Sequence, residues 1–347
     1  MRCGDFRETY AEDMAIFESP LPRWLLGIFV ACLATLPFWA TSYWMDVLNR
    51  ILIATVAALG LNILTGFTGQ ISLGNAAFLS VGAYVTAYLG GRLGLPFPVV
   101  IPAAGAATAL VGMVFGVPSL RLKGLYLAVA TLAAHFVIEF TVTHWESVTG
   151  GVNGTSVPAA RLGALELGGD KKLFWLVLPV TALLLYFAKN LFRTKVGKAF
   201  VAIRDQDISA EVMGVNVFKY KLLSFGISSF YVGVAGALLA YQARIISPEN
   251  FPITIAIDQL GMIIIGGLGS VLGSIFGAVF VTLLPEVLRL LTGALSDTFP
   301  QLYGLFAPLK MGLFGLAIVL FLVFEPDGMA ARWHKVKNYW KLYPFSY

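Results

Sequence analysis

The stretch GFTGQISLGN at residues 66–75 lies in the middle of a window that carries no charged side chain. Between Arg50 and Arg92 there is no Asp, Glu, Lys or Arg. This window is too long for one crossing, because a single helix spans a bilayer with about 20 apolar residues. Two apolar runs, Ile51–Leu64 and Ala76–Leu89, flank the small and polar stretch. The pattern predicts two membrane segments that are joined through residues 66–75.

The polar stretch has two interpretations. At membrane depth, irregular backbone occurs only where protein buries it or where it lines a watery cavity, because an unpaired amide in lipid is costly. The stretch is therefore either a turn at the membrane face or a broken element beside a solute path, a device that transporters use. The second interpretation makes five residues candidates for the path: Thr68, Gln70, Ser72, Gly74 and Asn75.

The composition places the whole chain in a membrane. Of 347 residues, 58% are hydrophobic and 12% are charged, and the mean hydropathy is +0.81. Soluble domains carry about 25% charged residues. The hydrophobic segments predict an all-α polytopic membrane protein with about ten transmembrane or re-entrant helices. Its net charge of +5 favours basic cytoplasmic loops over nucleic-acid binding.

Charge also predicts how the chain is organised. Residues 1–23 are a polar lead-in without the apolar core of a signal peptide, residues 24–325 a transmembrane domain, and residues 326–347 a basic tail. Residues 189–221 hold seven Lys and Arg against three acidic residues. Because positive loops stay inside, we expect this loop and both termini in the cytoplasm, and the loop 143–172 in the periplasm. Whether Ile253–Ile265 spans the membrane or re-enters is left open.

A second glycine turn, GGLG at residues 266–269, repeats the plan of the first, with apolar runs on both sides between Ile253 and Leu284. Transporters often carry paired, inverted segments around a solute site, which adds Gly266, Gly267 and Gly269 to the candidate path. The alternative is that small residues recur in any membrane helix, since they let backbones approach closely.

Several kinds of chemistry are absent from the sequence. It contains no Gly-x-x-x-x-Gly-Lys-[Ser/Thr] phosphate loop, so we do not expect it to hydrolyse ATP by that mechanism. It has no Gly-x-Ser-x-Gly nucleophile motif. Three histidines and the distant Cys3 and Cys32 give no metal-binding pattern. The chain is predicted not to be an enzyme and to bind no cofactor or metal.

Few ionisable residues fall inside the predicted segments. His135 and Glu139 are four apart, so they share a helix face and can touch. Asp258 is placed at the start of one segment, and Glu286 at the end of another. Intramembrane charge suggests function, such as a proton relay. We favour the simpler interpretation, in which His135 and Glu139 form a local pair and the other two lie at the interface.

Residues 195–214 have helical spacing, with Phe200, Ile203, Ile208 and Val212 apolar among charged residues. They predict one cytoplasmic amphipathic helix that ends at Gly214, a residue that commonly stops helices. Acidic side chains within it are repelled by anionic lipid. The pattern therefore favours docking on a partner protein over binding to the membrane surface.

Taken together, these stretches resemble the LivM-type permease subunits of bacterial branched-chain amino acid importers driven by ATP-binding-cassette subunits. The resemblance starts with GFTGQISLGNAAF at residues 66–78 and covers nearly everything after Trp24. It continues through LRLKGLYLA (120–128), TGGVNG (149–154), GVNV (214–217), YK (220–221), SPE (247–249), GGLGS (266–270) and EPDG (325–328). One departure is Asn75, where family members often carry a histidine.

The resemblance implies half of a permease with a type II importer-like fold in the bacterial inner membrane. It implies four kinds of partner: a LivH-type second permease, two cytoplasmic ATPase subunits that use ATP and magnesium, a periplasmic binding protein, and membrane lipid. Nucleic acid is not expected. The segment 195–214 would be the part that couples to an ATPase, through Arg204, Asp205, Asp207, Ala210, Glu211 and Gly214.

The expected solutes are branched-chain or other hydrophobic amino acids. Within the same family, the alternatives are urea, short amides and small carboxylates. The residues alone also leave two other classes of function open. One is an ion-coupled secondary carrier that uses His135, Glu139 or Asp258 as a relay, and the other is a membrane scaffold or receptor.

Overall fold

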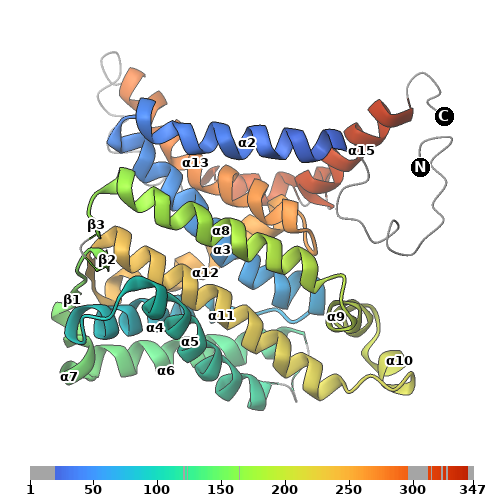
Figure 1. The fold of residues 1–347 in the computed structure, drawn as a ribbon. Helices are drawn as coiled ribbons and strands as arrows, with labels where there is room; N and C mark the ends of the chain where they lie inside the picture. Colours follow the sequence, from blue (N-terminus) through green and yellow to red (C-terminus); the bar gives the residue numbers. More distant parts are fainter. Residues whose placement is uncertain are drawn as a thin grey trace.

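A computed structural model describes residues 20–119, 122, 124–163, 165–295, 312–313, 315–321, 323–325 and 327–342. This part of the chain is mostly helical, and its long helices run along one another (Figure 1). Its strands are only two or three residues long. The predicted polytopic helical class is therefore confirmed in its main feature.

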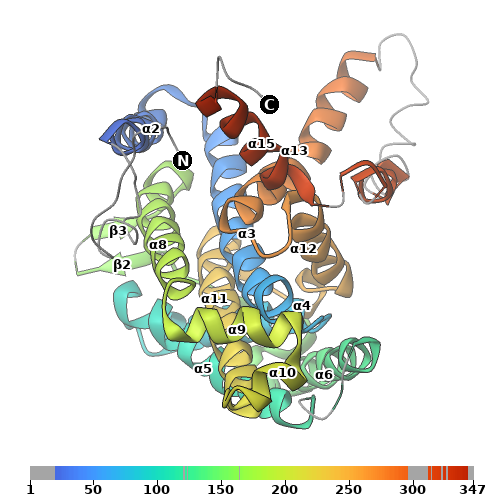
Figure 2. The same cartoon turned by 90° about the vertical axis from the view of Figure 1, so that its right-hand side faces the viewer.

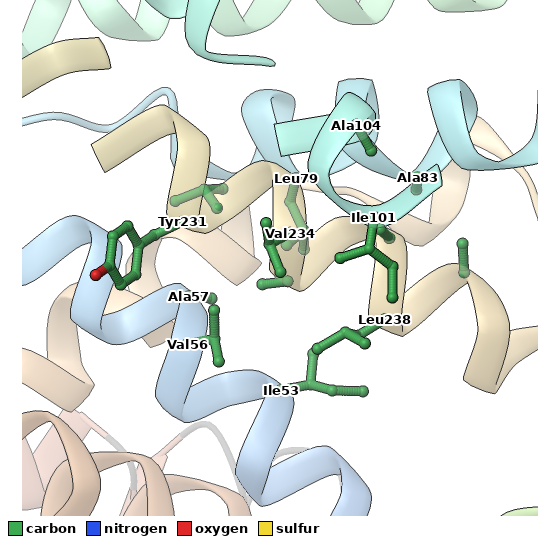
Figure 3. Packing of buried hydrophobic residues seen from close by; sticks show 14 of the residues in the cluster. Ile53, Val56, Ala57, Leu79, Ala83, Ile101, Ala104, Tyr231, Val234 and Leu238 are labelled. Atoms are coloured by element: carbon green, nitrogen blue, oxygen red, sulfur yellow. The ribbon is translucent and has the colours of Figure 1, made fainter. Parts of the chain in front are cut away.

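Two long helices form the centre of the bundle, α3 (Ser42–Thr68) and α11 (Val217–Ala243). α4 (Asn75–Thr86) and α5 (Phe97–Ser119) pack against α11. Helices that are apolar all round are buried in the core of a protein or in a membrane, and α3 and α11 are of this kind. Figure 3 shows the packing between these four helices at Ile53, Val56, Ala57, Leu79, Ala83, Ile101, Ala104, Tyr231, Val234 and Leu238.

The other helices surround this centre: α2 (Pro20–Trp39), α6 (Leu125–His144), α8 (Asp170–Leu191), α12 (Ile253–Gly266), α13 (Val271–Leu295) and α15 (Gly328–Leu342). Many of their large apolar side chains are exposed, including Trp24, Phe140 and Tyr186. In the described part, six helices are long and apolar enough to cross a membrane. These are α3, α6, α8 and α11, residues 97–118 of α5 and residues 271–290 of α13.

Several predicted boundaries were wrong. The uncharged run Trp24–Trp44 has the length of one membrane segment, but it is divided, because α2 ends at Trp39 and α3 begins at Ser42 after the extended Thr41. The predicted segment over the apolar run Ala76–Leu89 changes from α4 into a π-helix, η1 (Ala87–Arg92). The segment predicted to end at Leu284 continues to Leu295 as α13. The apolar run Leu305–Phe324, which is long enough for a further membrane segment, lies partly outside the described residues.

The two predicted polar loops lie at opposite ends of the bundle (Figure 1). Residues 143–172 form α7 (Glu146–Thr149), η2 (Gly151–Asn153) and three short strands, and a later segment of the chain contributes a fourth strand and η3 (Pro248–Asn250). β1 (Thr155–Ser156) pairs with β4 (Ile245–Ile246), and β2 (Ala160–Leu162) pairs with β3 (Leu165–Leu167). The basic loop forms α9 (Lys195–Asp205) and α10 (Asp207–Val212) at the other end, which faces the viewer in Figure 2.

Glycines let α4 and α11 approach backbone to backbone. A Cβ added to Gly82 would lie 2.2 Å from the carbonyl oxygen of Gly233, and one added to Gly236 would lie 2.1 Å from that of Leu79. Neither backbone atom can move without shifting a helix. Close packing over small residues is the usual way in which helices associate in lipid.

Gly236→Ala should therefore destabilise the bundle by about 2 kcal/mol or more, because the added methyl group forces α4 and α11 apart. The free energy of unfolding, measured by SDS titration in mixed micelles, checks this. Gly27→Ala is the matched control, since a Cβ there would meet nothing within 4 Å. Equal stability of the two variants would contradict the packing.

Candidate functional site: the glycine junction and the charged helix pair

The first glycine stretch begins where α3 ends. Gly69 has a φ of +73° and closes the helix in the left-handed conformation, which glycine adopts without penalty. Its N–H donates to the carbonyl of Thr65, and that of Gln70 donates to Leu64, both at 3.1 Å. This is a Schellman-type helix end. The chain then passes through Ser72 and Gly74 into α4, so the stretch is a tight turn between two helices.

The second glycine stretch joins α12 to α13. Gly267 and Gly269 have positive φ values of +122° and +73°. A Cβ on Gly266 would lie 1.9 Å from the carbonyl oxygen of Gly273, and one on Gly277 would lie 1.7 Å from that of Met262. These two helices therefore touch along their backbones on both sides of the turn.

The two glycine turns meet in the folded chain. A Cβ on Gly66 would lie 2.4 Å from the amide nitrogen of Gly269. The fully buried Asn62 of α3 accepts a hydrogen bond from that amide at 2.9 Å, and it donates to Ser270 O and Ser274 Oγ at 2.8 Å each. We call this contact the glycine junction (Asn62, Gly66, Gly269, Ser270 and Ser274). Sequence reasoning missed Asn62, although an amide inside an uncharged apolar run was a usable signal.

All four predicted polar side chains of the first turn are buried. Thr68 donates to the carbonyl of Ile63 at 3.0 Å, and the hydroxyl of Ser72 accepts from the amide of Gly74 at 3.3 Å. These two bonds are local and shape the turn. Gln70 instead reaches α11, where its Nε2 donates to Ser224 Oγ at 2.7 Å.

Asn75 connects the first turn to α12. Its Nδ2 donates to Oε1 of Gln259, and the two residues are only 1% and 4% exposed. α6 supports the turn from another side, because Thr131 Oγ1 accepts from the amide of Leu73 at 3.0 Å. Gln259 and Thr131 were not predicted. Gln259 could have been found as the one amide in the short apolar segment Ile253–Ile265.

The four polar side chains of the first turn are each at most 4% exposed. The cavity lined by Ala77, Ser80 and Glu139 has a volume of 10 Å³, about the room of one water molecule. A larger cavity of 550 Å³ lies elsewhere, between α13, residues 320–325 and α15, and its wall is mainly apolar. The polar turn is therefore closed in this conformation.

The prediction of one helix over residues 195–214 was wrong. The segment forms two helices, α9 and α10, separated by Gln206 in an extended conformation with φ −161° and ψ 105°. Asp207 then starts α10, where a carboxylate is favoured by the helix dipole, and its Oδ2 lies 3.4 Å from Nζ of Lys221 on α11. Helix α10 ends at Val212, two residues before Gly214, which has a φ of +87°.

The apolar side chains of the charged helix pair (residues 195–214) divide into two sets. Phe200 and Ile203 of α9 are buried against the bundle, as their spacing predicted. In contrast, Ile208, Val212 and Met213 are 65%, 81% and 84% exposed. They lie beside the exposed Asp205 and Glu211, whereas Ala210 is buried. The pair thus presents an apolar surface with acidic neighbours at one end of the molecule.

Arg204 of α9 points toward the glycine junction. Its Nη1 donates to the carbonyl oxygen of Gly66 at 3.1 Å, and its Nε donates to Oδ1 of Asp205 at 3.0 Å. Of the residues predicted for coupling, Arg204 and Asp207 contact the bundle through ionic groups. Asp205, Glu211 and Gly214 are exposed to solvent.

Two of the predicted ionisable residues in the membrane helices, His135 and Glu286, form local pairs. His135 Nε2 lies 3.6 Å from Oε2 of Glu139, which confirms that the two can touch. Glu286 is inside α13, accepts a hydrogen bond from Tyr43 and lies 3.4 Å from Nε of Arg289. Asp258 lies in the second turn of α12. Among the described residues, no three His, Cys, Asp or Glu residues are placed to hold a metal ion.

Comparison with known families identifies the family to which a chain with this arrangement belongs. The profile of the family described as "Branched-chain amino acid transport system / permease component" matches residues 43–322. The chain belongs to this family. Both glycine turns and the charged helix pair fall inside the matched region, and the resemblance to LivM-type permeases is confirmed. With six long apolar helices described, this permease is a multi-pass inner-membrane protein and not an enzyme.

Individual relatives agree with the family. The high-affinity branched-chain amino acid transport permease LivM of Salmonella typhimurium is 29% identical over 329 residues, which cover 88% of this chain and 74% of that protein. A probable LivH permease of Methanocaldococcus jannaschii is 25% identical, covering 81% and 90%. The ribose import permease RbsC of Haemophilus influenzae is 24% identical, covering 73% and 79%. No solved structure shows a significant match to the permease.

Asn62→Ala should destabilise the permease by about 3 kcal/mol, because it leaves the partly buried amide of Gly269 and two further polar groups without their partner. SDS titration in mixed micelles measures the loss. Thr141→Val is the control, since that exposed hydroxyl bonds only the carbonyl of its own helix at Val137, and it should change stability by less than about 0.5 kcal/mol. A loss of that small size for Asn62→Ala would contradict the junction.

Proposed function

We propose that this chain is the permease subunit of an ATP-binding-cassette importer that moves branched-chain or other hydrophobic amino acids across the bacterial inner membrane. The observation that carries the proposal is the family match over residues 43–322 together with the exposed charged helix pair. The sequence has no phosphate-binding loop of its own. Energy must then come from separate subunits that use ATP and magnesium, and this chain needs no bound cofactor.

The charged helix pair fits an ATPase partner. Three large apolar side chains, Ile208, Val212 and Met213, stand exposed at the tip of the bundle. Interfaces between proteins commonly have an apolar centre with a polar rim, and Asp205 and Glu211 would supply part of that rim. A helix that lays an apolar face into a groove is a common way of docking. We assign α10 to the groove of a cytoplasmic ATPase subunit.

The buried amides would close the solute path. Gln70 bonds Ser224, and Asn75 bonds Gln259, so the first turn is tied to α11 and α12. Such bonds stabilise the closed state by only about 1 kcal/mol each, so they can be exchanged for bonds to water or solute. With Thr68, Ser72 and the glycines of both turns, these amides form the gate that we place on the path.

Sidedness and partners follow from the charges. The end that holds α9 and α10 carries the basic loop, so we place it in the cytoplasm, together with both termini and about ten membrane segments in all. The opposite end, with residues 143–172, would face the periplasmic binding protein. Exposed apolar side chains on α5, α6 and α13 would meet lipid or a LivH-type second permease.

One prediction of the proposed function concerns the source of energy for transport. Proteoliposomes that hold this permease with its second permease, its ATPase subunits and its binding protein should take up radiolabelled leucine, isoleucine or valine only when ATP is inside. The chain alone should show no uptake. Uptake by the chain alone under a proton or sodium gradient would contradict the proposal and favour an ion-coupled carrier.

Another prediction of the proposed function concerns the gate. Cysteine placed at Asn75 or Gln259 should react slowly with a small polar thiol reagent in the resting assembly, because both positions are buried, and about tenfold faster or more during turnover. Cysteine at Thr55 is the control, since that buried residue bonds the carbonyl of Ile51 in its own helix. Labelling of the gate positions at the rate of the control in every nucleotide state would contradict the gate.

A further inference from the structure

Arg204 is connected to the end of α3. A carbonyl in the last turn of a helix has no partner within the helix, and the Nη1 of Arg204 supplies one to Gly66 at 3.1 Å. A cation there is also favoured by the helix dipole. The outer edge of the same guanidinium is held by Asp205, with 3.0 Å between Nε and Oδ1. The side chain therefore bridges α9 and the glycine junction.

The glycines of both turns leave the space that this side chain fills. A Cβ on Gly69 would lie 3.2 Å from Cγ of Arg204, and one on Gly269 would lie 2.9 Å from its Nη1. Any larger residue at either position would push the guanidinium away from Gly66. Arg204 thus lies over the place where the two turns meet.

A second charged link attaches α10 to a different helix. Nζ of Lys221, near the start of α11, lies 3.4 Å from Oδ2 of Asp207, and the two side chains are only 12% and 24% exposed. Because the pair is largely shielded from water, its attraction is screened less than that of a surface pair. The break at Gln206 lies between the two attachment points.

The two attachment points are connected again inside the bundle. Ser224 Oγ donates to the carbonyl of Lys221 at 2.7 Å and accepts from Gln70 at 2.7 Å. Gln70 follows the end of α3, to which Arg204 is bonded. A closed ring of contacts therefore runs from Arg204 to α3, across Gln70 and Ser224 to α11, and back through Lys221 to Asp207.

We propose that Arg204 and Lys221 are positioning residues that convert a bend of the charged helix pair at Gln206 into a change of separation between α3 and α11 at Gln70. The proposal rests on the proposed function, because the bend would be imposed by the docked ATPase. Movement of α9 carries the end of α3 and the glycine junction, whereas movement of α10 carries the start of α11. The hydrogen bond from Gln70 to Ser224 must break when α3 and α11 separate.

Arg204→Gln and Lys221→Gln test this in the reconstituted four-component assembly. Each should lower the solute taken up per ATP hydrolysed about tenfold or more, since each removes one charge-assisted contact. ATPase subunits should still co-purify, and basal hydrolysis should persist. Lys198→Gln is the matched control, because it removes an exposed cation from the same helix and should keep the wild-type ratio.

The outcomes separate the inference from the function on which it rests. If the wild-type assembly takes up no amino acid with ATP, the proposed function fails. If the wild-type assembly does take up amino acid with ATP, and both variants keep its ratio of solute taken up to ATP hydrolysed, the positioning role of Arg204 and Lys221 is overturned while the proposed function stands. If the ATPase subunits no longer co-purify with the variants, the positioning role is overturned too, because Arg204 and Lys221 would then serve docking or folding.

A covalent rescue keeps the inference testable if the variants lose stability. An ideal Cβ on Gly69 lies 3.7 Å from Cβ of Arg204, within the roughly 3.5–4.5 Å that a disulfide requires. Because Gly69 has a φ of +73°, any side chain there adds strain of its own, so the reference variant carries one too. In a background of Cys3→Ser and Cys32→Ser, the double variant Gly69→Cys/Arg204→Cys should behave like Gly69→Ser/Arg204→Gln when reduced. Oxidation should restore uptake per ATP toward wild type. A disulfide verified by mass spectrometry without any recovery would overturn the role of Arg204.

Discussion

The contact between Gly66 and Gly269, fixed by the side chain of Asn62, is the constraint on which the rest of the structure depends. It brings the end of α3 against the turn between α12 and α13, at a distance that any Cβ would prevent. The side chain of Asn62 is fully buried, and an unsatisfied amide at such depth would be costly. We therefore expect the bonds of Asn62 to form or break together, so that the end of α3 and the turn between α12 and α13 move as one body.

Buried polar groups divide the bundle into a rigid part and a part that can open. In the glycine junction, one side chain, Asn62, bonds Gly269, Ser270 and Ser274, and the junction lies between backbones that touch. The gate differs, because Gln70 and Asn75 each make one side-chain bond to another helix. Oε1 of Gln70 has no hydrogen-bond partner in the described chain. We propose that a few interchangeable amide bonds beside the junction let the gate open, as a two-state equilibrium between closed and open conformations requires.

Sequence reasoning located the elements better than their connections. The apolar segments, both glycine turns and the buried side of α9 at Phe200 and Ile203 follow from local spacing, which needs no knowledge of neighbours. The partners of Asn62 and Asn75 are 208 and 184 residues away, so no local pattern reveals them. The break at Gln206 was missed for the same reason, since it is held in place by Lys221 of another helix. The family resemblance supplied the expected role of residues 195–214 in ATPase coupling, but not their division into two helices.

The central claim is that α9 and the glycine junction move together while α3 and α11 separate. Pairs of spin labels in the full assembly, with and without a trapped ATP analogue, measure this directly. The account predicts that the distance from Lys198 to Leu268 stays constant, whereas the distance from Ile71 to Phe218 changes by about 2 Å or more. A change between Lys198 and Leu268 with none between Ile71 and Phe218 would contradict it.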